Sequence, residues 1–216
     1  MCKPFIALEG LDGAGKTTMI NKLKEDTELQ EKMINATGAK GIKFFREPGG
    51  LLESEKIRET IMCSSDFTCI ELAALFTTAR SVLLRKEIIP ALQDNYIVIL
   101  DRFIASTYAY QGVGMRLDEL ENITNAIIPH MVNPHYIFLN ISTSESIKRL
   151  KARMEEVNAL DSFDESVIRE RAYLYSRFFI EGGNTYTPIN ADRDVDNVYN
   201  QLTSVLLNIC DGYRTI

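Results

Sequence analysis

The chain has 216 residues, of which 45% are hydrophobic and 25% are charged. This length and composition fit one globular domain and exclude a disordered or fibrous chain. The net charge of −6 argues against a general nucleic-acid binder or a membrane-surface protein, since both need an excess of Lys and Arg.

The first predicted element is a buried strand at Phe5–Glu9, and a glycine-rich segment follows it directly. This segment, Gly10-Leu-Asp-Gly-Ala-Gly15-Lys16-Thr17, matches the P-loop pattern G-x-x-x-x-G-K-[ST]. Its glycines let backbone N–H groups turn toward an anion, and the helix that starts near Lys16 adds its positive dipole end. Lys16 can reach the β- and γ-phosphates, and Thr17 can ligate Mg²⁺. The pattern predicts a nucleoside triphosphate site; the alternative is a glycine-rich turn with an exposed lysine.

Strand-like and helix-like stretches alternate after this segment. Further strands are predicted at Ile42–Phe45, Tyr96–Leu100, Tyr136–Ile141 and near Ile189. Helices are predicted at about 16–35, 54–64, 69–93, 117–128, 144–157, 164–181 and 194–209. The strands at 96–100 and 136–141 are nearly all apolar, which is typical of parallel strands covered on both faces.

This order predicts an α/β fold of the P-loop kinase type, with a five-stranded parallel sheet flanked by helices on both faces. We expect residues 1–216 to form a single domain, because no linker or repeat divides the chain. The polar stretch at about 148–165 is either an exposed helix and loop or a lid.

Polar side chains follow the predicted strands, at the sheet edge where such folds bind ligands. Asp101 ends the third strand, where its carboxylate can orient Mg²⁺ or, alternatively, cap a helix. Arg46 and Arg102 follow the second and third strands and can hold an acceptor phosphate. Phe76 and Arg80 are four residues apart on a predicted helix, so they share one face and can cover a base together.

Four segments occur in a specific order: FIALEGLDGAGKTT, REPGG, LFTTAR and DRFIASTYAYQG. In this combination the chain resembles thymidylate kinase, a family of the P-loop nucleoside monophosphate kinase superfamily, from Phe5 to about Asn208. The resemblance implies transfer of a phosphoryl group from ATP to dTMP with Mg²⁺, and a homodimer formed through helices that include the one at 69–93. Two alternatives remain open: the same chemistry on another acceptor, such as dUMP, a modified dUMP or dGMP, or a P-loop nucleotide-binding protein with little turnover.

The resemblance also implies two groups of binding residues. ATP would be bound by Gly10, Leu11, Asp12, Gly13, Ala14, Gly15, Lys16, Thr17 and Thr18. The dTMP site would consist of Asp12, Arg46, Pro48, Phe76, Arg80, Arg102, Ser106, Thr107, Tyr110 and Gln111.

Individual roles at the dTMP site follow from the same resemblance. Arg46 and Arg102 would bind the dTMP phosphate, and Phe76 would stack on thymine. Asp12 would bond the deoxyribose 3′-hydroxyl, while Tyr110 would lie against the sugar and disfavour a ribose. The base edge would be read by Arg80, Thr107 and Gln111. Phe76 and Tyr110 could instead be core aromatics, and Thr107 a satisfied helix residue.

The catalytic residues implied are Lys16, Arg102, Arg149 and Arg153. No arginine lies between Gly10 and Lys16, so the lid at about 148–165 would supply one, through Arg149 or Arg153, as in the bacterial type of the family. The lid departs from the family pattern, because Arg153 is followed by Met154 and an arginine usual near Ser162 is absent.

The cysteines and the first apolar run predict a cytoplasmic protein. Cys2, Cys63, Cys69 and Cys210 form no C-x-x-C pair, so we expect reduced thiols rather than disulfides or a zinc site. The apolar run that precedes Glu9 is too short for a signal peptide or a membrane span. We expect small nucleotides as partners, with no nucleic-acid polymer and no membrane.

Overall fold

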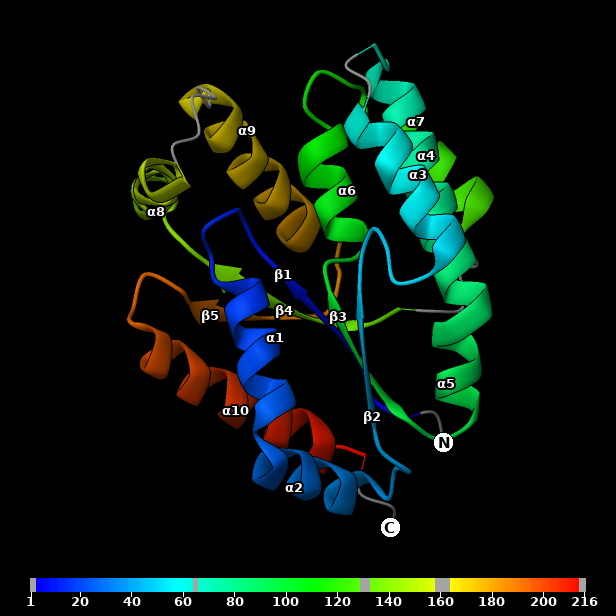
Figure 1. Cartoon of the computed structure of the whole chain (residues 1–216), viewed down its shortest axis with the longest axis vertical. Coiled ribbons are helices and arrows are strands. Elements are labelled where there is room, and N and C mark those ends of the chain that lie inside the picture. Colours follow the sequence, from blue (N-terminus) through cyan, green and yellow to red (C-terminus); the bar gives the residue numbers. More distant parts are fainter. Residues whose placement is uncertain (1–2, 64–65, 129–132, 158–163, 214–216) are drawn as a thin grey trace.

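The computed structural model describes residues 3–63, 66–128, 133–157 and 164–213; side chains are not described at 62 and 154–157. Within this part the centre is a five-stranded parallel sheet in the order β2-β3-β1-β4-β5 (Figure 1). The strands are β1 (Phe5–Glu9), β2 (Ile42–Arg46), β3 (Ile97–Asp101), β4 (His135–Asn140) and β5 (Tyr186–Asn190). The predicted α/β fold with a parallel sheet is confirmed, and strand bounds agree within a few residues.

Helices cover both faces of this sheet. In chain order they are α1 (Lys16–Glu25), α2 (Thr27–Thr37), α3 (Leu52–Cys63), α4 (Cys69–Leu83), α5 (Ile89–Gln93), α6 (Ile104–Gln111), α7 (Leu117–Ile127), α8 (Thr143–Val157), α9 (Glu165–Ser176) and α10 (Val195–Asp211). Figure 1 shows α1, α2 and α10 on one side, and α4, α5, α6 and α9 on the other. No helix of the described residues is long and apolar enough to cross a membrane.

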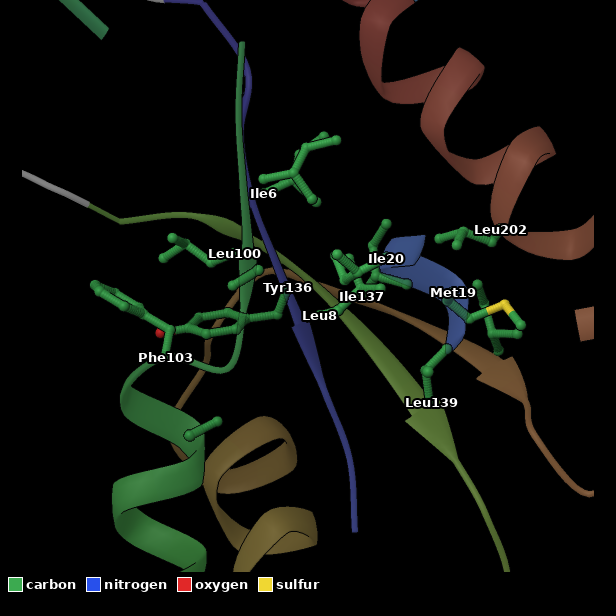
Figure 2. Close-up of a cluster of buried hydrophobic side chains, with 14 of the residues drawn as sticks. Ile6, Leu8, Met19, Ile20, Leu100, Phe103, Tyr136, Ile137, Leu139 and Leu202 are labelled. Atoms are coloured by element: carbon green, nitrogen blue, oxygen red, sulfur yellow. The ribbon is translucent and has the colours of Figure 1, made fainter. Parts of the chain in front are cut away.

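The central strands are buried on both faces, as their apolar sequences predict. Every residue of β1 and β3 is buried. Tyr136 and Ile137 are neighbours in β4 and point to opposite faces, because side chains alternate along a strand (Figure 2). Ile137 lies toward Ile20 of α1, and Tyr136 lies toward Phe103, just before α6. The two hydrophobic layers fix β1, and with it the segment that follows Glu9.

The helix predicted at 16–35 is wrong as one element, because it consists of α1 and α2 with a break at Asp26. Asp26 leaves helical geometry, and its carboxylate accepts a hydrogen bond from the Leu29 N–H at 2.9 Å, which caps α2. The other carboxylate oxygen accepts from the Tyr199 hydroxyl of α10 at 2.8 Å. One side chain thus ends α1, begins α2 and connects α2 to α10.

Two other long predicted helices contain a π-helical turn. The helix expected at 69–93 runs through α4, the π-helical Leu84–Ile88 and α5. The helix expected at 164–181 runs through α9 and the π-helical Arg177–Glu181. Of the predicted lid at about 148–165, residues 158–163 lie outside the described residues.

The short helix α6 was not among the predicted helices. Its eight residues, IASTYAYQ, include β-branched and aromatic types with modest helix propensity. Its start is held instead from another element: the Glu9 carboxylate of β1 accepts hydrogen bonds from the N–H groups of Phe103 at 2.7 Å and Ser106 at 3.1 Å. Because the capping group comes from a residue far away in the sequence, the segment itself carries no signal that a helix begins there.

Replacing Asp26 with alanine removes the α2 cap, so Asp26→Ala should lower the free energy of unfolding by about 1 kcal/mol. Denaturant unfolding measures this change, with Asp26→Asn expected to retain most of the stability because it keeps an acceptor oxygen. The exposed Glu31 of α2 provides the control, since Glu31→Ala removes no cap. Equal stabilities of the Asp26→Ala and Glu31→Ala variants would contradict the assigned role of Asp26.

Candidate active site

The predicted phosphate cradle lies between β1 and α1, at the carboxyl edge of the sheet. Gly10 and Gly15 adopt positive φ angles of 150° and 90°, which side chains rarely tolerate. A Cβ on Gly10 would also come within 2.7 Å of the Leu139 carbonyl oxygen of β4. The glycines are therefore needed for the loop to turn tightly against the neighbouring strand.

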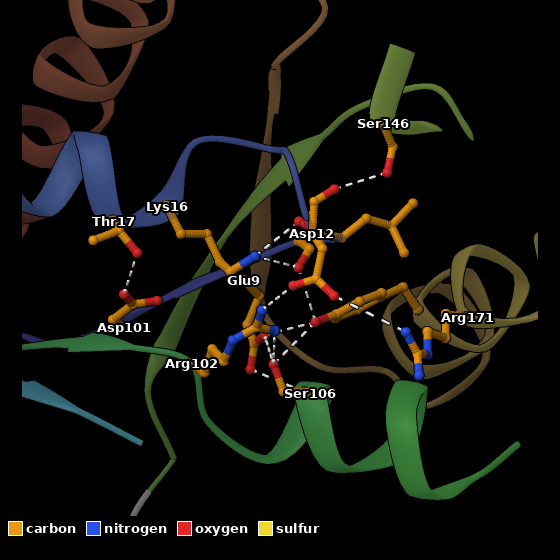
Figure 3. A network of polar contacts seen from close by, with 12 residues as sticks. Glu9, Asp12, Lys16, Thr17, Asp101, Arg102, Ser106, Ser146 and Arg171 are labelled. Atoms are coloured by element: carbon orange, nitrogen blue, oxygen red, sulfur yellow. Dashed lines mark hydrogen bonds and ion pairs between the residues drawn. The ribbon is translucent and has the colours of Figure 1, made fainter. Parts of the chain in front are cut away.

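Lys16 is buried inside this loop. Its Nζ donates to the carbonyl oxygens of Gly10 at 2.7 Å and Leu11 at 2.8 Å (Figure 3). Burial, reinforced by the positive charge of Arg102, lowers the pKa of Lys16 to about 7. An entering anion would raise this pKa by stabilising the ammonium.

Thr17 lies at the start of α1, and its hydroxyl donates to the Asp101 Oδ2 atom at 3.1 Å. Asp101 is the last residue of β3, directly beside β1 in the sheet. A hydroxyl and a carboxylate oxygen so placed beside a phosphate cradle are the hard ligands that Mg²⁺ accepts. The donor set therefore fits that ion.

Asp12 projects from the cradle into a group of cations. Its Oδ1 receives a hydrogen bond from Arg102 Nη2 at 2.6 Å, and its Oδ2 lies 3.9 Å from Arg171 Nη1 of α9 (Figure 3). Its backbone carbonyl accepts from the Ser146 hydroxyl of α8 at 2.7 Å. Burial works to raise the pKa of Asp12, but the charges of Arg102, Lys16 and Arg171 hold it below its usual value.

A cavity of about 220 Å³ opens beside this group of charges. It is lined by Glu47, Pro48, Arg58, Ile61, Phe76, Arg80, Arg102, Ser106, Thr107, Tyr110 and Gln111. Eight of these residues were predicted for the acceptor site, and α4 contributes Phe76 and Arg80 from one face as expected. The cavity and the cradle are adjacent because Arg102 lines the first and bonds to Asp12 of the second.

Arg80 forms a buried ion pair with Glu47 at the cavity wall. Its other donors reach Thr107 Oγ1 at 2.8 Å and the Phe103 carbonyl at 3.0 Å. The second carboxylate oxygen of Glu47, Oε1, is buried without a partner, and burial raises the pKa of this residue. The cavity wall thus presents the guanidinium of Arg80, held in place by its partners, and the unpaired carboxylate oxygen of Glu47.

Outside the cavity lining lie the exposed side chains of three predicted site residues, Arg46, Arg153 and Thr18. Arg46 ends β2 opposite Asp101, so it lies at the correct edge, but its side chain is exposed. Arg153 is exposed on α8. Thr18, predicted as part of the ATP cradle, is also exposed, on α1.

Arg149, the other lid arginine, is committed to internal contacts. Its Nε bonds Glu145 at 2.9 Å, Nη1 bonds the Gly13 carbonyl at 3.2 Å, and Nη2 bonds the Arg193 carbonyl at 3.2 Å. This side chain therefore ties α8 to the cradle and to the loop before α10.

Sequence reasoning missed several residues that support the site, above all Glu9, Arg171 and Tyr175. Ser106 and Tyr175 donate to Glu9 Oε2 at 2.6 and 3.1 Å, and Tyr175 also lies 3.1 Å from the Gly10 carbonyl. The charge of Glu9 at the end of an apolar strand was a usable signal. Arg171 and Tyr175 offered none, because only the fold brings α9 to β1.

Comparisons with known proteins agree with the motifs. The family model for thymidylate kinase matches residues 8–202. The thymidylate kinase of Mycoplasma capricolum is 35% identical over 209 residues, covering 94% of each chain, and that of Staphylococcus haemolyticus is 30% identical, covering 94% of this chain and 97% of its own. A crystal structure of thymidylate kinase from Ehrlichia chaffeensis superimposes with a TM-score of 0.67 at 25% identity, covering 95% of this chain and 99% of that one.

The lowered pKa of Lys16 predicts proton uptake on triphosphate binding. At about pH 8 the free lysine is mostly neutral, and the phosphates of ATP restore its charge, so binding should take up a fraction of a proton that approaches one as the pH rises. Calorimetry in buffers of different ionisation enthalpy measures this quantity. Lys16→Arg keeps its charge and should show less uptake at the same pH; equal uptake in the two proteins would contradict the prediction.

Proposed function

Since the chain belongs to the thymidylate kinase family, it phosphorylates dTMP to dTDP at the expense of ATP, and we propose how its residues divide this work. The cradle Gly10–Thr18 binds the phosphates of ATP, and the cavity between α3, α4 and α6 binds dTMP. The alternatives, another deoxynucleotide acceptor or a protein with little turnover, are not favoured, because the relatives from Mycoplasma capricolum, Mesoplasma florum and Staphylococcus haemolyticus are named thymidylate kinase.

One observation carries this assignment: the hydrogen bond of 2.6 Å between Arg102 and Asp12. Arg102 lines the cavity and Asp12 belongs to the cradle, so a nucleotide in each would meet at this pair. Phosphoryl transfer needs the attacking and leaving oxygens in line across a short gap. A site with two adjoining compartments supplies that arrangement.

On the donor side, Lys16 exchanges its bonds to the Gly10 and Leu11 carbonyls for oxygens of the β- and γ-phosphates. Thr17 and Asp101 would hold Mg²⁺, which fits their contact of 3.1 Å beside the cradle. When bound, the ion neutralises phosphate charge. The cradle contributes its inward N–H groups and the start of α1.

On the acceptor side, Phe76 stacks on thymine, while Arg80, Thr107 and Gln111 face the base edge. Pro48 and Ser106 complete the wall of the same cavity. Arg102, joined by the long side chain of Arg46 from the same sheet edge, binds the dTMP phosphate. Asp12 accepts the 3′-hydroxyl of the sugar, and Tyr110 packs where a ribose 2′-hydroxyl would project.

The chemistry requires no general base, because the attacking oxygen belongs to a phosphate that is already ionised at neutral pH. The residues act by alignment and by neutralising charge in a loose transition state. Lys16 and Arg102 share that charge, and Arg149 and Arg153 come from the lid at about 148–165. Arg149 already reaches the Gly13 carbonyl at 3.2 Å, which supports a role at the cradle.

The chain functions as a single domain that assembles into a homodimer. One hydrophobic core cluster extends from Phe5 to Cys210, which supports the single domain.

The dimer is proposed to form through α4. On this helix Ala73 is buried whereas Ile70 is 52% exposed, so apolar side chains lie on more than one face and one face can pack against a second subunit. Light scattering should give twice the chain mass of 24.5 kDa; a monomer at micromolar concentration would contradict the dimer. We place the enzyme in the cytoplasm, with nucleotides and no nucleic-acid polymer or membrane as its partners.

The activity is tested by following dTDP formation from dTMP with ATP and Mg²⁺, beside dUMP and dGMP as rival acceptors. Lys16→Ala should reduce kcat by ~10³-fold or more, since it removes a charge that stabilises the transition state. Far-UV circular dichroism checks that the variant is folded. Absence of turnover in the wild-type enzyme with dTMP, or a preference for dUMP or dGMP, would sink the proposed acceptor.

The stacking role of Phe76 predicts a selective loss of acceptor affinity. Phe76→Ala should raise the KM for dTMP roughly 5- to 150-fold, because a base–aromatic stack contributes about 1–3 kcal/mol, and leave the KM for ATP unchanged. Thr78→Ala on the exposed face of the same helix is the matched control. Parallel changes in both KM values would show that the substitution disturbs the fold rather than a stack.

A further inference from the structure

Arg171 of α9 is a charged side chain beside Asp12 that the assignments above leave without a function. It lies outside the predicted lid, on the helix that packs beside α6 (Figure 1). Its guanidinium carbon is 4.2 Å from the centroid of the Tyr110 ring, and that of Arg102 is 5.0 Å from the same centroid. Tyr110 thus contacts two guanidinium groups, which limits where each can lie.

The hydrogen-bonding capacity of Arg171 is incompletely used. Its Nε is buried without a hydrogen-bond partner, and its Nη1 lies 3.9 Å from Asp12 Oδ2, too far for a hydrogen bond. A buried donor left unpaired costs about 1–3 kcal/mol, so such groups normally have an acceptor. Because this guanidinium faces Asp12, we expect its missing acceptor near Asp12, where the cradle meets the cavity.

Neighbouring arginines are already committed. Arg102 is bonded to Asp12 and Ser106, Arg80 to Glu47 and Thr107, and Arg149 to Glu145 and two carbonyl oxygens. Among these four arginines, Arg171 has the buried donor without a partner. It is therefore the guanidinium best prepared to receive a ligand oxygen.

The charges around Asp12 point to an anion as that ligand. Asp12 faces Lys16, Arg102 and Arg171, and each of these cations acts on its ionisation. Glu9 also acts on Lys16 and Arg102, but Asp12 is the carboxylate that lies 3.9 Å from Arg171. Asp12 is only partly buried, with 40% of its side chain exposed, so a ligand can reach the space between it and Arg171. A phosphoryl group presents charged acceptor oxygens and would supply the acceptor that Arg171 Nε lacks.

We propose that Arg171 is a catalytic residue whose guanidinium binds the phosphoryl group as it passes from ATP to dTMP. The proposal rests on the proposed function. The bond from the γ-phosphorus to the bridging oxygen of ADP breaks while a bond to a dTMP phosphate oxygen forms, and the electron pair of the broken bond remains on ADP. The Nε atom of Arg171, which has no partner in the free protein, bonds one equatorial oxygen, and Nη1 turns from Asp12 to another.

The experiment measures kcat and both KM values for the wild type, Arg171→Ala and Arg171→Lys. Arg171→Ala should lower kcat by ~10³-fold, the size of effect known for arginines that act in phosphoryl transfer, with both KM values within about fivefold of wild type. Millimolar guanidinium ion should restore part of the kcat of Arg171→Ala, which loss of a structural contact would not allow. Arg171→Lys keeps a charge without the planar fork and should lose about tenfold in kcat.

Arg169→Ala is the matched control, because Arg169 lies on the same helix, is exposed and pairs with Glu165 at 3.9 Å; it should keep wild-type kinetics. A raised KM for dTMP with unchanged kcat, or wild-type kcat in Arg171→Ala, would overturn the proposal. If Arg171→Ala does not fold, a folded Arg171→Lys with wild-type kcat overturns it equally. Absence of dTMP turnover in the wild type would instead refute the proposed function, so the two failures are distinguishable.

Discussion

The buried carboxylate of Glu9 connects the three elements that form the site. It ends β1, accepts the N–H groups of Phe103 and Ser106 at the start of α6, and accepts the hydroxyl of Tyr175 from α9. Burying a carboxylate is costly unless its oxygens are hydrogen-bonded, and here these donors offset the cost. Burial still raises the pKa of Glu9, against the opposing effects of Ser106 and Arg102. Because one side chain connects three elements, the loop after β1, the neighbouring cavity and Arg171 keep a defined relative position.

The same arrangement explains how a site for highly charged ligands is stable without them. Lys16 bonds the carbonyl groups of its own loop, Arg102 bonds Asp12 and Ser106, and Arg80 pairs with Glu47. In the free protein each of these cations is hydrogen-bonded to a protein acceptor. Nucleotide binding therefore replaces one hydrogen-bonded contact with another and does not have to begin from an unpaired buried charge. Asp12 pairs with Arg102 in the free protein. In the proposed assignment, arriving phosphates release it from this pair, and it then bonds the sugar 3′-hydroxyl.

Much of this could be predicted from sequence because the signals are local. The apolar run at Phe5–Glu9 gave the first strand with its observed bounds, and the glycine spacing gave the cradle. Eight of the residues that line the cavity were predicted, since residues such as Pro48, Phe76 and Arg102 lie in short, specific motifs.

The contacts that join elements were not predictable in this way. Glu9 caps a helix ninety-four residues away, and Arg171 approaches Asp12 only through the docking of α9. The break at Asp26 depends on both a local cap and the distant Tyr199.

The most direct test of this account is a crystal structure with dTMP, ADP, Mg²⁺ and aluminium fluoride, which imitates the phosphoryl group in transfer. The account predicts that Lys16 Nζ leaves the Gly10 and Leu11 carbonyls for phosphate oxygens, and that Arg171 contacts the fluoride ligands while Asp12 turns to the sugar 3′-hydroxyl. Lys16 and Arg102 remaining on their present protein acceptors, with Arg171 remote from the aluminium, would contradict it.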